Sequence, residues 1–503
     1  PIPFVRQVHP PMARQVLSPR GWSQMASDKF RNARARSAER PPAAGSGTGG
    51  LSRRGFLAGA AGAAAITAAE WTPVFRVVAG AEAATLPTPP NFPAAITPYQ
   101  QAYQNWSGEI KIDAVWTCAP NSPADVVTLA NWAKANTYKL RPRGAMHGWT
   151  PLTVVQGASV DKVILADTTQ HLNSISVNTA TSPKTVTAGA GATMDNILAA
   201  LQTAGLGLVS VPAPGVLTIA GALAVNAHGA ALPKTGETQI SGTTYGSLSN
   251  QVTALTAVVW DTTAGAYVQK TYSRSDAAIK PLLTHLGRAF ITSVTLQAGT
   301  NYRMRCESWY DIPTSTLFGP AGTTGRTFAS YIAAAGRVEA IWFPFTTNPW
   351  VKVWTPTATK PLLSRQVTAP YNYTFSDSIN QATSDFVAQI ALGNTAGTPA
   401  FGQSQLAIVQ TGIIVTGTWD IWGWSKDVML YIRPTTLRLT EGGGAVITSR
   451  ANIQRVINEF TTWFKARIAY YQGLGKYPIN GPVEIRCCGL DQVADVKVAS
   501  AGA

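Results

Sequence analysis

The most constraining feature of this chain is a histidine in a glycine-flanked turn, residues 141–149, which read RPRGAMHGW. Residues 123–134 before it repeat apolar side chains at three- and four-residue spacing after a Ser-Pro start, which predicts an amphipathic helix. A short strand over residues 139–142 is predicted to lead into the turn. Glycine lets backbone N–H groups approach an anion closely, and Arg143 adds positive charge, so the turn could surround a pyrophosphate. For this stretch alone, a surface loop with an ordinary hydrogen-bonded histidine stays open.

Two later stretches, which follow the turn along the chain, complete the same pattern. Residues 212–229 read PAPGVLTIAGALAVNAHG, and residues 286–296 read LGRAFITSVTL. Together the three resemble the flavin domain of the vanillyl-alcohol oxidase family: a histidine loop, a G-x-x-T-I-x-G pattern before H-G, and a closing strand. The run RPRGAMHGWTPL, residues 141–152, is most similar to the bacterial cholesterol oxidases that carry covalently bound FAD. This resemblance extends over nearly everything after residue 84.

The resemblance implies FAD as cofactor, with a covalent bond from His147 to the flavin. If His147 is not the attachment point, His171, His228 and His285 compete for that role. The residues implied to contact FAD are Pro142, Arg143, Gly144, Ala145, Met146, His147, Gly148, Gly215, Thr218, Ile219, Gly221, Ala222, Asn226, Gly229 and Ile291.

The net charge of +15 raises the question of a nucleic-acid partner. Residues 1–83 carry eleven Lys and Arg against four Asp and Glu, which leaves +8 for the remaining chain. No basic run in that remainder alternates with aromatic residues, so we expect no nucleic-acid binding. A transient contact with an anionic membrane surface and a simple solvated face both stay open.

The four cysteines exclude a disulfide scaffold and a zinc site. Cys118, Cys306, Cys487 and Cys488 are too few and too scattered for the first, and none has zinc-ligand spacing. We therefore expect buried thiols and no metal.

Residues 52–57, SRRGFL, precede an alanine- and glycine-rich stretch, and residues 81–83, AEA, offer small side chains for cleavage. This pattern resembles a twin-arginine export signal. The apolar run over residues 56–69 is shorter than the ~20 residues that span a bilayer, so no membrane anchor is expected there. Export of a folded protein suits an enzyme that acquires FAD in the cytoplasm. We expect a secreted or cell-envelope protein whose residues 1–83 are a disordered leader and signal.

The expected fold is α+β, a two-domain architecture like that of vanillyl-alcohol oxidase. An FAD-binding α+β domain is expected over residues 84–300, and a substrate-binding domain with a large antiparallel sheet covered by helices over residues 301–503. The resemblance also implies a C-terminal return segment that is missing from this chain. Strands are predicted over residues 162–165, 185–188, 252–260, 340–345 and 351–354, and a helix over residues 453–470.

The stretch VEIR, residues 483–486, is the first candidate for catalysis. Side chains alternate along a strand, so Glu484 and Arg486 point to one face while Val483 and Ile485 point to the other. Such a pair beside an apolar pocket offers both a stabiliser of charge and a gate, as the family resemblance implies. From the residues alone, a surface salt bridge worth ~0–1 kcal/mol is the simpler interpretation.

Two more carboxylates are candidates. Glu339 precedes the apolar stretch AIWF, and Glu441 precedes three glycines. The resemblance places both near the substrate, where either could act as a general base and also move a proton from C4 to C6 of a steroid. A loop carboxylate and a strand-edge charge are the ordinary alternatives.

The implied reaction is oxidation of the 3β-hydroxyl of cholesterol-like sterols to the ketone, with hydride transfer to FAD, reduction of O2 to H2O2, and Δ5 to Δ4 isomerisation. A sugar-lactone or polyol oxidase of the same flavin family is the alternative enzyme, because a Glu-x-Arg pair also occurs there. A sterol-binding protein without activity is the alternative outside enzymes. The tryptophans that could line a sterol slot, or belong to an ordinary core, are Trp342, Trp350, Trp354, Trp419, Trp422 and Trp424.

Overall fold

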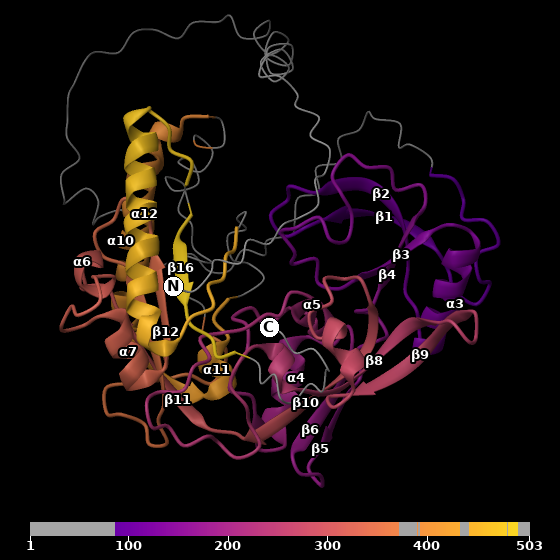
Figure 1. The fold of residues 1–503 in the computed structure, drawn as a ribbon, viewed down its shortest axis with the longest axis horizontal. Coiled ribbons are helices and arrows are strands. Elements are labelled where there is room, and N and C mark those ends of the chain that lie inside the picture. The colour runs from indigo at the N-terminus through magenta and orange to yellow at the C-terminus, as the bar shows by residue number, and fades with distance from the viewer. Residues whose placement is uncertain (1–85, 372–389, 391–392, 433–441, 480, 491–503) are drawn as a thin grey trace, which may run out of the picture. The chain divides into compact units, whose positions relative to one another are not determined.

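Three β-sheets and the helices that pack on them make up the part of the chain that the structure describes (Figure 1). The computed structural model describes residues 86–371, 390, 393–432, 442–479 and 481–490. The expected signal, its two arginines and Glu441 lie outside these residues. No helix within the described ranges is long and apolar enough to cross a bilayer.

The first sheet carries the glycine-flanked turn at the end of one of its strands. Its order is β1-β2-β4-β3, with β1 (Tyr99–Gln104), β2 (Lys111–Cys118), β3 (Lys139–Arg143) and β4 (Val163–Asp167). Helix α3 (Pro123–Ala135) is capped by Ser122, whose side chain forms a capping box with Asp125. It buries Val126 and Leu129, as the apolar spacing predicts. The predicted helix and the strand before the turn are confirmed.

The second sheet is antiparallel and supports the stretch of residues 212–229, hereafter the second loop. Its strands are β5 (Ile175–Asn178), β6 (Lys184–Gly189), β7 (Leu206–Gly207), β8 (Val252–Asp261), β9 (Ala266–Ser273) and β10 (Phe290–Thr300). Helices α4 (Met194–Thr203) and α5 (Ile219–Ala224) pack on it. The strand predicted from residue 286 begins only at Phe290. Leu286 and Gly287 adopt φ of 51° and 68°, which belong to a turn.

The third sheet is the large antiparallel sheet that the sequence predicts. Its order is β14-β15-β11-β13-β12-β16, and all pairs are antiparallel except β14 with β15. The strands are β11 (Arg303–Trp309), β12 (Arg337–Trp342), β13 (Trp350–Pro356), β14 (Arg365–Gln366), β15 (Asp420–Trp424) and β16 (Val483–Arg486). Strand β12 ends three residues earlier than predicted, because Pro344 cannot donate a ladder bond and Phe345 turns with φ of 65°.

Helices pack on both faces of the third sheet. Val338 and Ala340 of β12 face α7 (Phe328–Ala335) and α12 (Ile453–Gly473). Ile341 points to the other face, where α10 (Thr398–Thr416) covers one end. The rest of that face carries Arg337 and Glu339 toward the second sheet, so strand alternation places charged residues in the interior. This α+β arrangement is the expected fold class.

The remaining helices among the described residues are short. Cys118 and Cys306 are buried as expected, whereas Cys487 and Cys488 are only half-buried. The short helices are η3 (Leu248–Gln251), η4 (Ala277–Leu282), α6 (Thr314–Leu317), η5 (Thr395–Gly397), α11 (Ser425–Met429) and η6 (Arg450–Asn452).

Candidate active site

The two glycine-containing loops lie against each other at Gly144. A Cβ atom added there would collide with Thr218 Oγ1, so the histidine turn touches the start of α5. A Cβ at Gly229 would likewise collide with the carbonyl oxygen of Val211. Both positions therefore require glycine because main chain and side chain approach too closely for any larger residue. The structure brings together the two stretches that the sequence assigns to FAD.

His147 lies half-buried beside two tryptophans. Its ring stacks on Trp106 with centroids 3.7 Å apart and an interplanar angle of 22°, and it meets Trp149 edge-on at 5.5 Å. Met146 before it has φ of 55°, a conformation uncommon outside glycine. The bent backbone and the two aromatic contacts fix the orientation of the imidazole.

Arg143 is paired within the protein. Its guanidinium forms an ion pair with Asp167 at the end of β4. Burial raises the pKa of Asp167, but hydrogen bonds from Thr169 and Gln170 outweigh this effect and lower it. Asp167 is therefore ionised at neutral pH. It neutralises the positive charge of Arg143, which the sequence analysis expected to attract a pyrophosphate.

The other residues implied to contact FAD differ in burial. Ile219, Ala222 and Ile291 pack their side chains into the core of the second sheet, so main chain is what they can offer a ligand. Thr218 is 2% exposed at the start of α5, and Asn226 adopts φ of 52° after it. Of the rest, Pro142 and Ala145 are half-buried, Gly215 is buried, and Gly148 and Gly221 are exposed.

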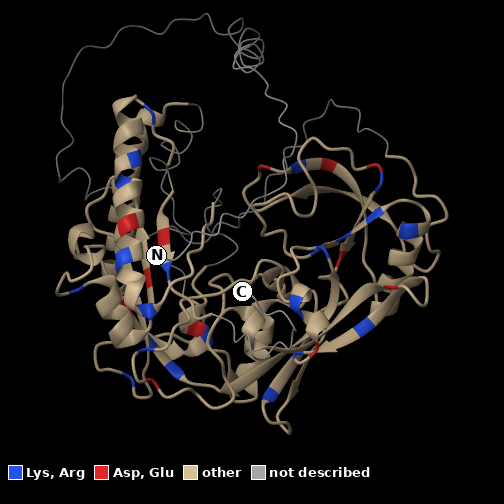
Figure 2. Cartoon of the chain, in the orientation of Figure 1, with Lys and Arg blue, Asp and Glu red and all other residues tan. Residues whose placement is uncertain are grey.

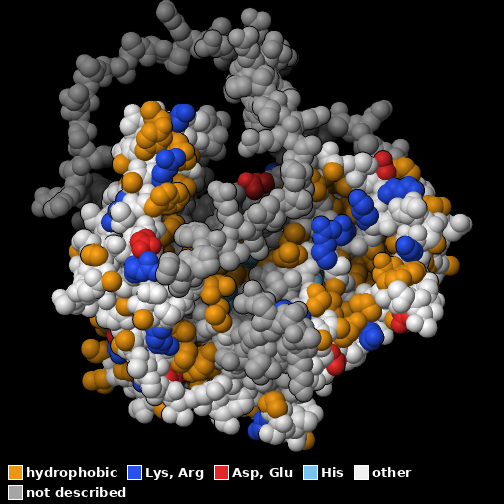
Figure 3. All heavy atoms as spheres, in the orientation of Figure 1, with side chains coloured by type: hydrophobic (Ala, Val, Ile, Leu, Met, Phe, Trp, Pro, Cys, Tyr) orange, Lys and Arg blue, Asp and Glu red, His pale blue; other side chains and the backbone are white. Residues whose placement is uncertain are grey.

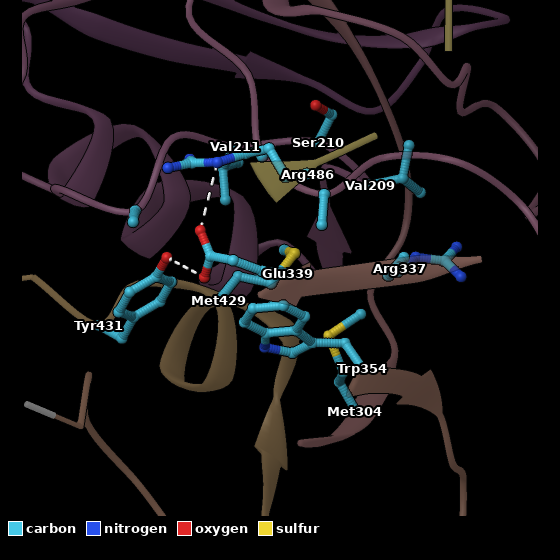
Figure 4. Close-up of a pocket in the computed structure, with 13 residues that line it drawn as sticks. Val209, Ser210, Val211, Met304, Arg337, Glu339, Trp354, Met429, Tyr431 and Arg486 are labelled. Carbon is cyan, nitrogen blue, oxygen red and sulfur yellow. Dashed lines mark hydrogen bonds and ion pairs between the residues drawn. The ribbon is translucent and has the colours of Figure 1, made fainter. Parts of the chain in front are cut away.

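A pocket of about 380 Å³, part of it open solvent, lies between the second loop and the third sheet (Figure 4). One wall consists of main chain and small side chains, and among the described residues its Ser210 Oγ has no hydrogen-bond partner. Such a wall fits one face of a flat ring system with polar edges, as a flavin is. That wall contains Val209, Ser210, Val211, Ala213, Gly229 and Ala230, and the opposite wall contains Met304, Arg337, Glu339, Trp354, Met429, Tyr431 and Arg486.

Glu339 is the centre of a row of charged residues that crosses the third sheet. Figure 2 shows acidic and basic residues close together on the strands beside α12. The strand register pairs it with Lys352 of β13 on one side and with Arg486 of β16 on the other. Arg486 Nε lies 3.2 Å from Glu339 Oε1, and Tyr431 donates a 2.6 Å hydrogen bond to Glu339 Oε2 (Figure 4). Glu339 is 1% exposed, so protein groups take the place of water around its carboxylate.

Glu484 and Arg486 also form an ion pair with each other. Glu484 lies at the exposed rim, whereas Arg486 is half-buried and lines the pocket. Val483 and Ile485 pack on the opposite face, in the cluster with α7 and α12. The alternation predicted for this strand is confirmed, and Arg486 links the rim carboxylate to the buried one.

The sequence analysis missed three polar residues near Glu339, which are Lys352, Tyr431 and Arg337, and it considered His228 only as a possible flavin attachment point. Burial, and then the nearby Glu339, raises the pKa of Tyr431 well above its usual range, so its hydroxyl remains a donor. Burial lowers the pKa of His228, which favours the neutral ring. A signal for Lys352 was present in the sequence, since a charged residue stands between Trp350 and Trp354 in an apolar strand.

Arg337 is neutralised by a partner of its own. Its guanidinium makes hydrogen bonds of 3.0 and 2.7 Å to Glu237 and points away from Glu339 (Figure 4). Burial raises the pKa of Glu237, but bonds from Arg337 and Tyr245 bring it down to about 2. Arg337 therefore contributes little net charge to the pocket.

The tryptophans divide between pocket and core. Trp354 lines the pocket, whereas Trp342 lies on the opposite face of the sheet, 5.5 Å from the ring of Phe464. For Trp342 the ordinary-core alternative therefore holds. Trp350 packs with α10, Trp419 is 38% exposed, and Trp422 and Trp424 flank Arg303.

Two family models match the chain: the substrate-binding domain of cholesterol oxidase over residues 303–503, and an FAD-binding domain over residues 116–264. Among solved structures, cholesterol oxidase from Brevibacterium sterolicum and a histidine-to-alanine mutant of it each share 60% identity, with a TM-score of 0.80 over 83% of this chain and 78% of theirs. A solvent-stable cholesterol oxidase shares 52% identity, with a TM-score of 0.80 over 82% of this chain and 77% of its own. A search of curated proteins found no match. With its two glycine-containing loops packed together and a pocket built around Glu339, the chain belongs to the cholesterol oxidase family.

Proposed function

We propose that the protein is an FAD-dependent oxidase that converts the 3β-hydroxyl of a cholesterol-like sterol to the ketone. The observation that carries this proposal is the buried carboxylate of Glu339, held by Arg486 and Tyr431 in the pocket of a chain 60% identical to a cholesterol oxidase. Apolar side chains on the same wall suit a fused-ring substrate, whose burial contributes ~25 cal/mol per Å². They are Met304, Trp354 and Met429.

The residues of this chain act on the hydroxyl proton. When bound, FAD supplies the hydride acceptor and passes the electrons to O2, which leaves as H2O2. Glu339 accepts the proton through Oε1, because the Tyr431 hydroxyl already occupies Oε2. The guanidinium of Arg486, 3.2 Å from Oε1, stabilises the negative charge that develops on the substrate oxygen. Residues of the second loop, on the wall that faces Glu339, would hold the flavin.

The same carboxylate also serves the isomerisation. After Glu339 releases its first proton, it can take a proton from C4 of the Δ5 ketone and return it at C6, which gives the conjugated Δ4 ketone. Glu441 remains the other carboxylate proposed to act near the substrate.

Anaerobic spectra distinguish this function from its alternatives. Cholesterol should bleach the flavin absorbance of the purified holoenzyme, and a sugar lactone should leave it unchanged. Bleaching by the lactone alone would favour the sugar-lactone oxidase. A protein that binds sterol but carries no flavin after purification would favour the non-enzymatic alternative.

We also propose that His147 is the covalent attachment point for FAD, as supported by its fixed position in the glycine turn. His147→Ala should release its FAD on acid denaturation, whereas the parent protein should keep its flavin in the precipitate. His171→Ala is the matched control, because His171 is exposed. Flavin that stays attached in the His147 variant would assign the link to another residue.

Export is proposed to follow the twin-arginine pathway. The support is the SRRGFL motif, because the receptor of this pathway reads the guanidinium pair. Changing Arg53 and Arg54 together to lysine should leave the precursor in the cytoplasm, as fractionation and immunoblotting would measure. Normal secretion of this double variant would contradict the proposal.

Transient contact with a membrane surface is proposed as the route by which sterol is collected. Helix α12 exposes Phe460, Trp463 and Tyr470, beside the cationic Arg467 (Figure 3). Aromatic and basic side chains together suit the interface of an anionic bilayer. Sedimentation with anionic and with neutral vesicles, at low and high salt, tests this contact.

A further inference from the structure

Lys352 is a buried cation whose surroundings are unusual for lysine. It is 0% exposed, and it lies on the same face of the third sheet as Glu339, its register partner. The ammonium nitrogen lies 4.0 Å from Glu339 Oε2, too far for a hydrogen bond but close enough for strong attraction in a buried setting. Transfer of such a charge out of water is costly, so this position needs a compensating interaction.

Three aromatic rings supply much of that compensation. The nitrogen of Lys352 lies 2.9 Å from the ring centroid of Tyr431, 4.7 Å from that of Trp354 and 5.2 Å from that of Trp350. The electron-rich faces of aromatic rings attract cations within about 6 Å. The same Tyr431 donates its hydroxyl to Glu339 Oε2. Lys352 therefore contacts Glu339 in two ways: directly by charge, and through the ring that holds the carboxylate.

We propose, on the basis of the oxidase function above, that Lys352 is a positioning residue, whose ammonium group holds Tyr431 and Glu339 in the arrangement that accepts the substrate proton. Glu339 lies between two cations on neighbouring strands, with Arg486 at Oε1 and Lys352 with Tyr431 at Oε2. Removal of Lys352 leaves the pull of Arg486 unopposed and frees the Tyr431 ring to move. Lys352 does not line the described pocket, so it acts through these neighbours.

The proposal has a pH signature. Burial lowers the pKa of Lys352 to about 8, although the attraction of Glu339 opposes this shift. The ammonium is therefore present below pH 8 and lost above it, so flavin reduction should slow as the pH rises through about 8. Tyr431 stays protonated there, because its pKa lies well above the usual range. The other titratable or charged groups that face this cluster are Glu484, Arg486, Cys306 and His228.

Two variants test the proposal in the FAD-loaded enzyme by anaerobic stopped flow with cholesterol, from about pH 6 to about pH 10. This range brackets the pKa of Lys352 and ends close to the reference value for lysine. Lys352→Met should lower the rate of flavin reduction at neutral pH by about 10- to 100-fold, a part of the ~10²–10⁴ that a positioned base contributes. Its profile should lose the decline near pH 8, and KM should change little. Lys352→Arg keeps its charge at high pH, so it should retain more activity than the methionine variant and also lose the decline.

Lys465→Met is the matched control. Lys465 also lies over a tryptophan of this sheet, 5.4 Å from the Trp342 ring, but on the opposite face. It should keep the parent rate and profile. Removing one partner of a buried charge pair destabilises a protein, so Lys352→Met should unfold at a lower temperature than the parent, and the rates are compared well below that temperature.

Two outcomes overturn the inference while leaving the oxidase function intact: a parent enzyme reduced by cholesterol with no decline near pH 8, or a Lys352→Met enzyme that retains both the rate and the decline. A parent enzyme that cholesterol does not reduce would instead refute the proposed function itself.

Discussion

Glu339→Gln should abolish most of the activity, with flavin reduction by cholesterol slowed by about 10²–10⁴, the range that a positioned general base contributes. Glutamine keeps the size of the side chain and can still accept the Tyr431 hydrogen bond, but an amide cannot take the hydroxyl proton. Because the carboxylate is 1% exposed and bracketed by its partners, water cannot readily replace it. Rapid-mixing absorbance under anaerobic conditions measures the reductive step alone.

Glu307→Gln is the control for this prediction. Glu307 is a partly buried carboxylate on β11 of the same sheet, paired with Arg305 at 3.0 Å, and strand alternation turns it away from the pocket. Its loss should leave flavin reduction near the parent rate. If Glu339→Gln reduces its flavin as fast as the parent with FAD still bound, another group takes the proton, and Glu441 would then be the first to test.

Local patterns in the sequence predicted the elements of this fold well. The three- and four-residue spacing before the histidine turn gave α3, and alternation in VEIR placed Glu484 and Arg486 on one face of β16. These features depend on neighbours in the chain, so periodicity is enough to find them. Boundaries shifted where a turn intervened, as at Phe290 and Phe345.

The arrangement of the site depends on contacts between distant segments, which periodicity cannot supply. Glu339 and Arg486 pair because β12 and β16 are neighbours, although about 150 residues separate them. Trp350 and Trp354 flank Lys352 in its own strand, but the third ring, that of Tyr431, comes from a distant segment, and Arg143 pairs with Asp167 on the adjacent strand. The family resemblance supplied roles for Glu339 and Arg486, whereas Lys352 and Tyr431 became visible from the coordinates.

Removal of Arg486 should be the second most damaging change. Arg486→Met should slow flavin reduction by about 10²–10³, comparable to the loss of one donor aimed at a developing oxyanion. It also leaves Glu339 and Glu484 without the cation that lies between them. Arg486→Lys should rescue little, because an ammonium cannot contact both carboxylates with the planar fork of a guanidinium.

Glu484 and Arg486 should behave as one unit in a double-mutant cycle. Glu484 pairs with Arg486, which in turn contacts the buried carboxylate, so Glu484→Gln should slow flavin reduction less than the arginine change does. The expected loss is about tenfold, within the usual coupling of neighbouring charges. The double variant should then resemble Arg486→Met alone, because Glu484 has nothing left to orient.

Separate measurement of the two half-reactions decides what the pair does. A stabiliser of substrate charge slows flavin reduction, whereas a gate slows reoxidation by O2. If all of these variants keep both rates near the parent value with FAD bound, the pair is a surface salt bridge and has no part in catalysis.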